Sequence, residues 1–433
     1  MLPPRSPLAA FAVPGFRLFT TAQFLSFTAL TVQMIARGWA MQQLTNSPFM
    51  VSLVGALQIL PAAGLSFVGG EISDRFARKW ILLLAETGSF LGYASLAVLS
   101  ALGIMAPWHI LVTTAWIGSM FALANPSRQG LIVDLVPPSF GRKSITAYML
   151  VINLTVLTGP LFGGPVLTGV GMTAALGVSA LMMIPAIPLY GLLRPVQTQT
   201  VKRAAGSFID SLVKGVHYVR NEPEIRWMFA ALIIMVIFIN TWGALFPTIA
   251  HDVLHRGAGG LTAINLAVGT GAISGAILAV FLEGRISDAQ QQLGAGMLFA
   301  AFVILMAVTH IYAIALIASA VAAAAGAPFF INNMGAIQLR APEEFRARVI
   351  SVRFVVSAVQ PFGIMTLGAA AQFLGPQIAL GGSAAIGGLL LAGMAVTRRR
   401  VTKPTPSVEG PLAAEPSLDP GDGFLVPRSL GRS

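Results

Sequence analysis

The chain has 433 residues, of which 55% are hydrophobic and only 10% are charged. Soluble domains average about 45–50% apolar and about 25% charged residues, so this composition excludes an ordinary soluble protein and indicates a helical protein that crosses the membrane several times. The net charge of +11 does not indicate nucleic-acid binding, because the basic residues fall in alternate loops. The absence of cysteine excludes disulfides and thiolate metal ligands.

Twelve apolar segments follow a short leader at residues 1–15. Each is close to the roughly 20 residues that a helix needs to span a bilayer. We expect spans near 18–44, 50–70, 80–102, 109–131, 144–168, 173–193, 226–249, 261–283, 293–310, 313–338, 349–373 and 378–396. Prolines inside these segments are tolerated in membrane helices and often mark bends; they are Pro61, Pro160, Pro165, Pro185, Pro247, Pro328 and Pro361.

The loops between the segments alternate in charge. Those on one side carry nearly all the arginines and lysines, whereas the opposite loops carry almost none except Arg256. The positive-inside rule therefore predicts that both termini are cytoplasmic, which requires an even number of spans. No separate signal peptide is evident, and the first apolar segment is expected to remain as a span.

The two halves of the chain resemble each other. Gly70-Glu-Ile-Ser-Asp74 recurs as Gly284-Arg-Ile-Ser-Asp288, and Pro137-Pro-Ser-Phe140 has a counterpart in Pro342-Glu-Glu-Phe345. Two ordered echoes at similar offsets indicate a duplicated unit, as in transporters built from two related halves.

The region between the sixth and seventh segments is polar. Residues 207–220 could form an amphipathic helix on the inner membrane surface, although an ordinary long loop is the alternative. We therefore divide the chain into an N-terminal cytoplasmic leader (1–15), a six-helix bundle (16–194), a cytoplasmic linker with an amphipathic helix (195–223), a second six-helix bundle (224–397) and a disordered cytoplasmic tail (398–433).

The loop after the second segment carries a dense charge pattern. Its spacing resembles the signature loop of the major facilitator superfamily, in which glycine, aspartate and basic residues recur in this order. The matching residues are Gly70, Asp74, Arg75, Arg78 and Lys79, while Ala77 replaces the usual second glycine. The resemblance implies the major facilitator fold, an all-α membrane protein of twelve transmembrane helices in two pseudo-symmetric bundles.

The fifth segment contains Gly159-Pro160-Leu-Phe-Gly163-Gly164. It resembles the fifth-helix antiporter motif of the same superfamily, which marks exporters more than importers. A generic packing kink is the alternative, because glycines at this spacing allow close helix contact.

Further stretches resemble the branch that exports siderophores, macrolides and related drugs, the enterobactin-exporter-like transmembrane secretion effector family. These stretches are Arg37-Gly-Trp39, Leu44-Thr-Asn-Ser-Pro48, Asn125-Pro-Ser-Arg128, Asp134-Leu-Val-Pro137, the 215–226 linker and Phe345-Arg-Ala-Arg348-Val349.

The resemblance implies a secondary transporter of the bacterial inner membrane that exports amphipathic small molecules by alternating access. A proton gradient would supply the energy by antiport, with no cofactor, and the chain would work as a monomer in the lipid bilayer. The alternatives are an importer or lipid or metabolite mover on the same fold, and a non-transporting scaffold for an assembly pathway. No phosphate-binding loop, nucleophile elbow or His-Glu-x-x-His site is present, so we expect no enzyme activity.

Polar residues inside spans are the candidate site residues, because they are costly there. Gln33 and Arg37 lie one turn apart and could bind an anionic or hydrogen-bonding substrate, or Arg37 could brace a neighbouring helix. Glu86 could carry the coupling proton, or form a salt bridge to Arg128. The other candidates for the cavity could equally form structural hydrogen bonds between helices; they are Asn153, Asn240, Asn265, Asn332 and Gln360.

Conformational roles fall on the motifs. We expect Asp74 and the basic loop to latch the cytoplasmic side, and the helix around Pro160 to bend as the two bundles move. The residues assigned to gating are Gly70, Asp74, Arg75, Arg78, Lys79, Gly159, Pro160, Gly163, Gly164 and Asp288.

Overall fold

The regular secondary structure of the part that is described is helical, and short loops join the helices. The computed structural model describes residues 7–137, 140–193, 208–282 and 285–401, and within these ranges it contains no strand. Twelve helical stretches are long and apolar enough to cross a membrane, and they coincide with the twelve predicted segments to within a few residues. The prediction of an all-α membrane protein is confirmed. The predicted tail from 402 onwards and the first part of the predicted linker lie outside the described residues.

The first six spans are continuous helices, and a short helix precedes them. Pro61, Pro160, Pro165 and Pro185 all lie inside these helices without interrupting them. The elements are η1 (Pro7–Ala12), α1 (Pro14–Thr45), α2 (Pro48–Arg75), α3 (Arg78–Ala101), α4 (Pro107–Asp134), α5 (Gly141–Gly169) and α6 (Met172–Gly191).

The second half begins with a short helix, α7 (Phe208–Asn221), which packs against α13 and α8. The spans that follow are built from α8 (Pro223–Ile234), η3 (Met235–Ile239), η4 (Trp242–Leu245), α9 (Phe246–Thr248), η5 (Ile249–Val253), α10 (Gly257–Leu282), α11 (Asp288–Val308), α12 (Tyr312–Arg340), α13 (Glu343–Ser357), α14 (Gln360–Leu374) and α15 (Pro376–Val401). The last helix includes residues 398–401, which the sequence analysis assigned to the tail, because no proline interrupts it before Pro404.

Local chemistry explains where several helices begin. Pro48 occupies the first turn of α2, where its missing N–H costs nothing, and the hydroxyl of Ser47 accepts a hydrogen bond from the N–H of Met50 at 3.3 Å. Gly171 and Gly375 join the last two helices of each half with φ of +114° and +87°, values that favour glycine. Their corresponding positions agree with a duplicated unit.

Two spans of the second half are interrupted. The seventh passes through π-helical and 3₁₀ segments around Asn240, and the eleventh breaks between α13 and α14, where Pro361 opens the second piece. The side-chain Nε2 of Gln360 donates a hydrogen bond to the main-chain carbonyl of Asn240 at 3.2 Å. The two helix breaks therefore lie at the same level, and the side chain of Gln360 satisfies a carbonyl that the break in the seventh span leaves free.

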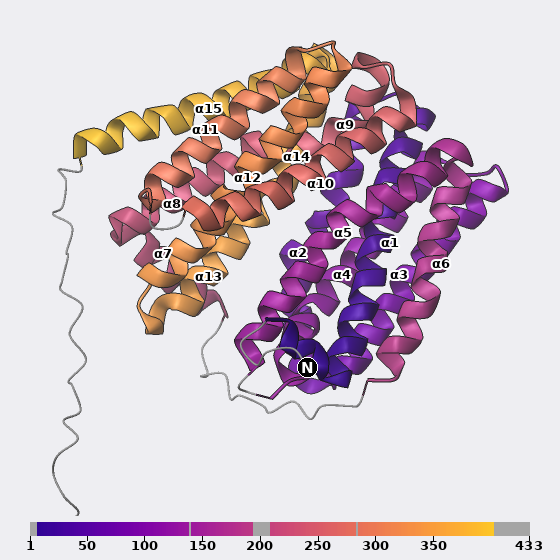
Figure 1. Ribbon diagram of the computed structural model, residues 1–433, viewed down its shortest axis with the longest axis horizontal. Coiled ribbons are helices and arrows are strands. Elements are labelled where there is room, and N and C mark those ends of the chain that lie inside the picture. The colour runs from indigo at the N-terminus through magenta and orange to yellow at the C-terminus, as the bar shows by residue number, and fades with distance from the viewer. Residues whose placement is uncertain (1–6, 138–139, 194–207, 283–284, 402–433) are drawn as a thin grey trace, which may run out of the picture.

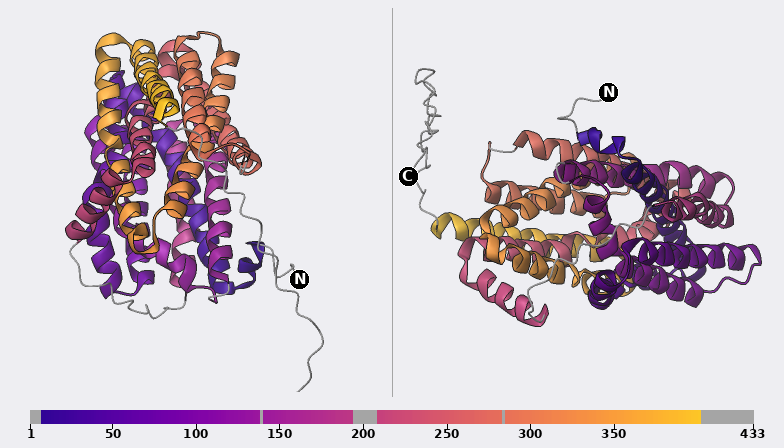
Figure 2. Two further views of the ribbon diagram at one scale, coloured as in Figure 1. Left: turned by 90° about the vertical axis from the view of Figure 1, so that its left-hand side faces the viewer. Right: turned by 90° about the horizontal axis from the view of Figure 1, so that it is seen from below.

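The spans form two six-helix bundles, one from α1–α6 and the other from α8–α15. The loops between them define two ends of the molecule. We call the end that holds residues 75–79, 141–143 and 285–287 the basic end, and the end that holds residues 46–47, 102–106 and 254–256 the apolar end. Figure 1 shows the bundles joined away from the N-terminus and diverging towards it, and Figure 2 shows the molecule from two further sides.

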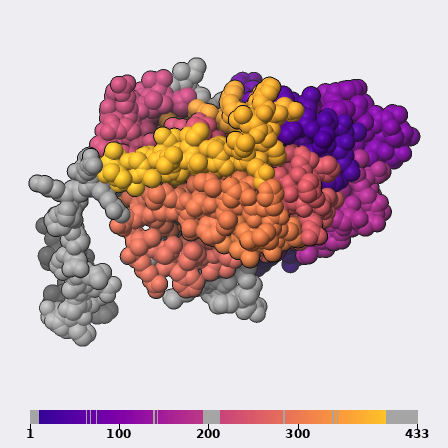
Figure 3. Space-filling view, turned by 90° about the horizontal axis from the view of Figure 1, so that it is seen from above, coloured from indigo at the N-terminus to yellow at the C-terminus, as the bar shows by residue number. Residues whose placement is uncertain are grey.

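The bundles meet through helix pairs that cross between the halves, chiefly α2 with α14 and α5 with α10. Hydrogen bonds cross between them at the apolar end: the hydroxyl of Ser47 donates to Gln372 Oε1 at 2.7 Å, and Thr248 donates to Gln42 Oε1 at 2.8 Å. From that end, the atoms of the N-terminal bundle lie directly against those of the C-terminal bundle (Figure 3).

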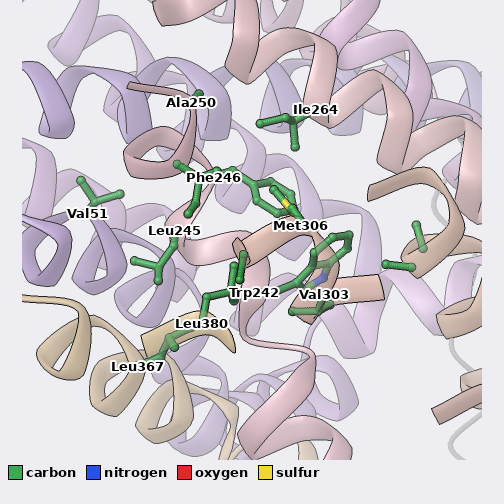
Figure 4. Packing of buried hydrophobic residues seen from close by; sticks show 14 of the residues in the cluster. Val51, Trp242, Leu245, Phe246, Ala250, Ile264, Val303, Met306, Leu367 and Leu380 are labelled. Carbon is green, nitrogen blue, oxygen red and sulfur yellow. The ribbon is translucent and has the colours of Figure 1, made fainter. Parts of the chain in front are cut away.

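An apolar core fills the contact between the bundles at this end. Trp39, Val51 and Val54 of the first half belong to the same buried cluster as Leu245 and Phe246 of the seventh span. Figure 4 shows Val51 on α2 in this cluster, with Leu245, Phe246 and Trp242 of the interrupted span. The apolar end is thus sealed by side chains that would meet water if the bundles parted there.

Candidate functional site

A cavity of about 90 Å³ lies between the two bundles, beside this apolar core. Its walls come from both halves. The lining residues are Met34, Arg37 and Gly38 of α1, Val51, Val54, Gly55 and Gln58 of α2, and Gly243, Ala244 and Pro247 of the seventh span. A water molecule needs about 10–15 Å³ by this measure, so the cavity holds several waters or a small chemical group.

Arg37 is the charged residue of this cavity, and it is 1% exposed. Its guanidinium donates to Thr114 Oγ1 at 3.0 Å, to Gln58 Oε1 at 2.9 Å and to the carbonyl of Gln33 at 3.4 Å. All three acceptors are neutral, and none of the ion pairs among the described residues includes Arg37. The arginine therefore braces three helical positions and lines the cavity at the same time.

A second polar site lies inside the N-terminal bundle. Arg128 of α4 and Glu86 of α3 form a salt bridge at 3.0 Å, and their side chains are 4% and 6% exposed. The guanidinium carbon of Arg128 also lies 4.7 Å from the ring centre of Phe121 and 5.2 Å from that of Phe27. These residues line a small cavity of about 20 Å³, enough for about one water.

The pair connects to a hydrogen-bonded network that the sequence analysis missed. Ser26 lines the same small cavity and hydrogen-bonds Tyr190 at 3.2 Å. Gln23 Nε2 donates to the Tyr190 oxygen at 2.9 Å, and the Tyr148 hydroxyl donates to Gln23 Oε1 at 3.3 Å. A signal was available in Gln23, an amide inside the first apolar segment, whereas nothing in the sequence pairs it with the two tyrosines.

The other predicted binding residues are not brought together in one site. Gln33 is fully buried and accepts a hydrogen bond from Ser179 of α6, inside the N-terminal bundle. Asn265 donates to the carbonyl of Leu261 on its own helix at 2.8 Å.

The remaining amides are equally dispersed. Asn332 donates to Gln291 at 2.9 Å and to Asp288 at 3.3 Å, near the basic end. Asn240 and Gln360 meet at the paired helix breaks, and Asn153 is exposed on α5. Of the predicted set, Arg37 alone lines the cavity between the bundles, and Gln58 is a lining residue that the sequence analysis did not single out.

The basic loop makes its described contacts within its own bundle. Arg78 pairs with Asp134 of α4, and Lys79 Nζ donates to the carbonyl of Gly191 at 2.5 Å. Arg75 pairs with Glu71 one turn away on the surface. Gly70 is half-buried near the end of α2, and the side chain of Asp74 lies outside the described residues. In this arrangement, the described loop contacts tie α3 to α4 and α6.

The matching position of the second half is better defined. Asp288 opens α11 and forms an ion pair with Arg340 of α12 at 3.0 Å. Arg340 also pairs with Glu224 at the start of α8, at 3.0 Å. The aspartate of the repeated motif therefore joins three helices of the C-terminal bundle at the basic end.

The glycines of α5 are positions of close helix contact. A Cβ atom at Gly159 would overlap Thr31 of α1, and one at Gly163 would lie 2.8 Å from Val32. A Cβ atom at Gly164 would overlap Thr262 of α10, in the other bundle. Pro160 is buried within the uninterrupted helix. Gly159 and Gly163 thus pack closely against α1, and Gly164 packs against α10 of the second bundle.

Similarity to known proteins identifies the class of this chain. Residues 5–416 match the transmembrane secretion effector family. The multidrug efflux pump Tap of Mycobacterium tuberculosis is 23% identical over 371 residues, which cover 82% of this chain and 86% of Tap. The enterobactin exporter EntS of Citrobacter koseri is 24% identical over 272 residues, 61% of this chain and 62% of EntS.

The fold is also shared with solved structures. A transporter of the POT family, crystallised with a thioalcohol-conjugated peptide, superposes with a TM-score of 0.73 at 13% sequence identity, covering 90% of this chain and 97% of that one. Three observations indicate the same class of protein: the family match along almost the whole chain, the twelve spans and this shared fold. The chain belongs to the transmembrane secretion effector family of the major facilitator superfamily, and it is a multi-pass transporter of the bacterial inner membrane rather than an enzyme.

Proposed function

We propose that this transporter exports amphipathic small molecules, of the drug or siderophore class, across the inner membrane in exchange for protons. The names of two relatives, a multidrug efflux pump and an enterobactin exporter, support this class of cargo. The Gly-Pro segment of α5 supports export as the direction. The division into bundles at 16–194 and 224–397 belongs to the same proposal.

The observation that carries alternating access is that the two bundles are sealed at one end. The bonds Ser47–Gln372 and Thr248–Gln42, which cross between the bundles, and the shared apolar core lie at the apolar end. Because basic loops face the cytoplasm in inner-membrane proteins, the basic end faces the cytoplasm in this proposal, and both termini lie there. The conformation would then receive cargo from the cytoplasm.

Cargo release requires the seal at the apolar end to open while the basic end closes. Rocking of two bundles about a site between them is the general device of transporters with repeated halves. The cavity between α1, α2 and the seventh span supports this proposal, because its walls would separate when the apolar end opens. One chain supplies both bundles and the whole route, so the monomer is the working unit.

Proton coupling is assigned to Glu86. Its carboxylate is buried against Arg128, so protonation would release the arginine from its ion pair and favour a new arrangement of α3 and α4. The small cavity beside the pair supports this role, because a water there would bring a proton to the carboxylate.

Transport by the purified protein in sealed liposomes tests the proposal. The assay follows a panel of fluorescent drugs and a catecholate siderophore under an imposed proton gradient of either sign. Export requires accumulation on the acidic side of the membrane, coupled to proton movement in the opposite direction. Movement of cargo with the protons would establish import, and no movement of any compound under either gradient would refute the proposal.

A further inference from the structure

The cavity between the bundles points to a definite class of cargo. We propose that it binds the anionic head group of an amphipathic substrate, with Arg37 and Gln58 as the residues that recognise the charge. This inference rests on the proposed export function and names the chemistry of its substrate. The apolar remainder of the cavity wall, formed by residues such as Val51, Val54 and Pro247, would contact the apolar body.

The hydrogen-bond capacity of Arg37 is not exhausted. A guanidinium carries five N–H donors, and Arg37 uses three of them on Thr114, Gln58 and Gln33. It lines the cavity and has no carboxylate partner among the described residues. A buried cation with neutral partners only is costly, and a bound anion would offset that cost.

Gln58 is oriented so that it adds a donor. Arginine cannot accept a hydrogen bond, so the amide oxygen of Gln58 must face Arg37, at 2.9 Å. Its NH₂ group is thereby directed elsewhere and makes no recorded hydrogen bond within the described part of the chain. The two polar side chains that line the cavity, Arg37 and Gln58, therefore both offer donors, which select an acceptor-rich group such as a carboxylate, sulfonate or phosphate.

The walls of the cavity come from both bundles, which indicates how the anionic head group would be released. Arg37 and Gln58 belong to the N-terminal bundle, whereas Gly243, Ala244 and Pro247 belong to the seventh span. A head group bound there would touch both bundles and would be separated from the apolar end while that end is sealed. Parting of the bundles at that end would remove one wall and release the substrate outward.

Two fluorescent probes with the same aromatic body test the inference. Anilinonaphthalene sulfonate carries a negative charge, and phenylnaphthylamine lacks it. Equilibrium binding of both is measured with the purified protein in detergent micelles, with protein-free micelles subtracted. We expect the sulfonate to bind at least about tenfold more tightly than the neutral probe, as one charge-assisted hydrogen bond allows.

Arg37→Gln should remove that preference and leave binding of the neutral probe unchanged, and Arg37→Lys should retain part of it. Arg226→Gln removes the same charge from an exposed position at the basic end and should change neither affinity. Equal binding of the two probes to the unmodified protein, or equal effects of Arg37→Gln and Arg226→Gln, would overturn the inference.

A second variant decides the matter if Arg37→Gln does not fold. The Cβ atom of an alanine at Gly55 would lie 3.8 Å from Ala244, an ordinary contact, and because Gly55 lines the cavity, the side chain introduced by Gly55→Leu should extend into it. We expect weaker binding of both probes, and unchanged binding would refute the site. Efflux of the probes from liposomes is a separate measurement. Loss of efflux with intact sulfonate preference would contradict the exporter and leave the anion site standing.

Discussion

Glu86 and Arg128 face each other inside the N-terminal bundle with almost no contact with solvent. Arg128 Nε and Nη1 have no hydrogen-bond partner among the described residues, so the glutamate and the rings of Phe27 and Phe121 are its recorded partners. Removing one member of a buried ion pair leaves an uncompensated charge, which typically costs about 3–5 kcal/mol. At the scale of single residues, this pair is therefore both a structural element and the candidate proton carrier.

We predict that Glu86→Gln abolishes proton-driven transport and lowers the midpoint of thermal unfolding in detergent. The neutral amide cannot change its charge, and it leaves Arg128 buried without a counter-ion. Transport in liposomes and a thermal unfolding curve measure the two effects.

A double variant separates the two roles of the pair. Replacing both Glu86 and Arg128 by methionine removes the charges together, and buried ion pairs replaced by apolar residues are often neutral or stabilising. We expect stability to return while coupling stays absent. Full transport by the folded double variant would show that the pair has no part in coupling.

Sequence reasoning identified Arg37, Glu86 and, as one alternative for Glu86, its salt bridge to Arg128, but not the neutral partners of Arg37. Arg37 and Glu86 stand out because charges inside apolar segments are rare. Gln58 and Gln23 carry the same kind of signal more weakly, since an amide in a span often makes a structural hydrogen bond. Asn265 shows why residue type alone does not identify a binding residue. Its side chain donates to a carbonyl of its own helix, and that orientation depends on rotamer and packing.

At the scale of elements, α5 determines how closely the bundles approach. Its glycines face α1 on one side and α10 on the other, and Gly164 is the position opposite Thr262 of the second bundle. A side chain there has to displace the threonine or separate the two helices.

Gly164→Ala should weaken the contact between α5 and α10 and shift the population away from the conformation sealed at the apolar end. The chain has no cysteine, so a single cysteine at Thr248 reports on that end through its rate of modification by an impermeant maleimide. We expect faster modification in the Gly164→Ala background. Gly169→Ala is the control, because no atom lies within 4 Å of its added Cβ, and similar rates in both backgrounds would contradict the prediction.

The elements themselves were largely predictable. A bilayer requires about 20 apolar residues per helix, so hydropathy alone locates the spans. The interruptions of the seventh and eleventh spans were harder to predict from the sequence. Pro247 and Pro361 indicated bends, but the π-helical stretches at 235–239 and 249–253 have no distinct periodicity in an almost uniformly apolar segment.

At the scale of the whole molecule, the two bundles are joined at one end and diverge at the other (Figure 1). The repeated motifs predicted two related halves, since sequence echoes survive duplication. They could not predict which end is closed, because that depends on a few contacts such as Ser47 with Gln372, residues 325 positions apart.

Locking those contacts should stop transport. Cysteines at Ser47 and Gln372, joined by a short thiol-cleavable cross-linker, would hold the apolar end closed. We expect transport to fall to background after cross-linking and to recover when the linker is reduced. Each single-cysteine variant treated in the same way should keep its activity, and undiminished transport with the linker in place would refute the requirement for opening at this end.

The apolar character of that seal has a thermal consequence. Its core is formed by Trp39, Val51, Val54, Leu245 and Phe246, side chains that would be hydrated once the bundles part. Burial of such surface contributes less free energy as water is cooled, because its heat-capacity change is large. Cooling should therefore raise the fraction of molecules whose apolar end is open. In a cold cell, more transporters would adopt the conformation whose cavity faces away from the cytoplasm, where the cargo binds in the proposed cycle.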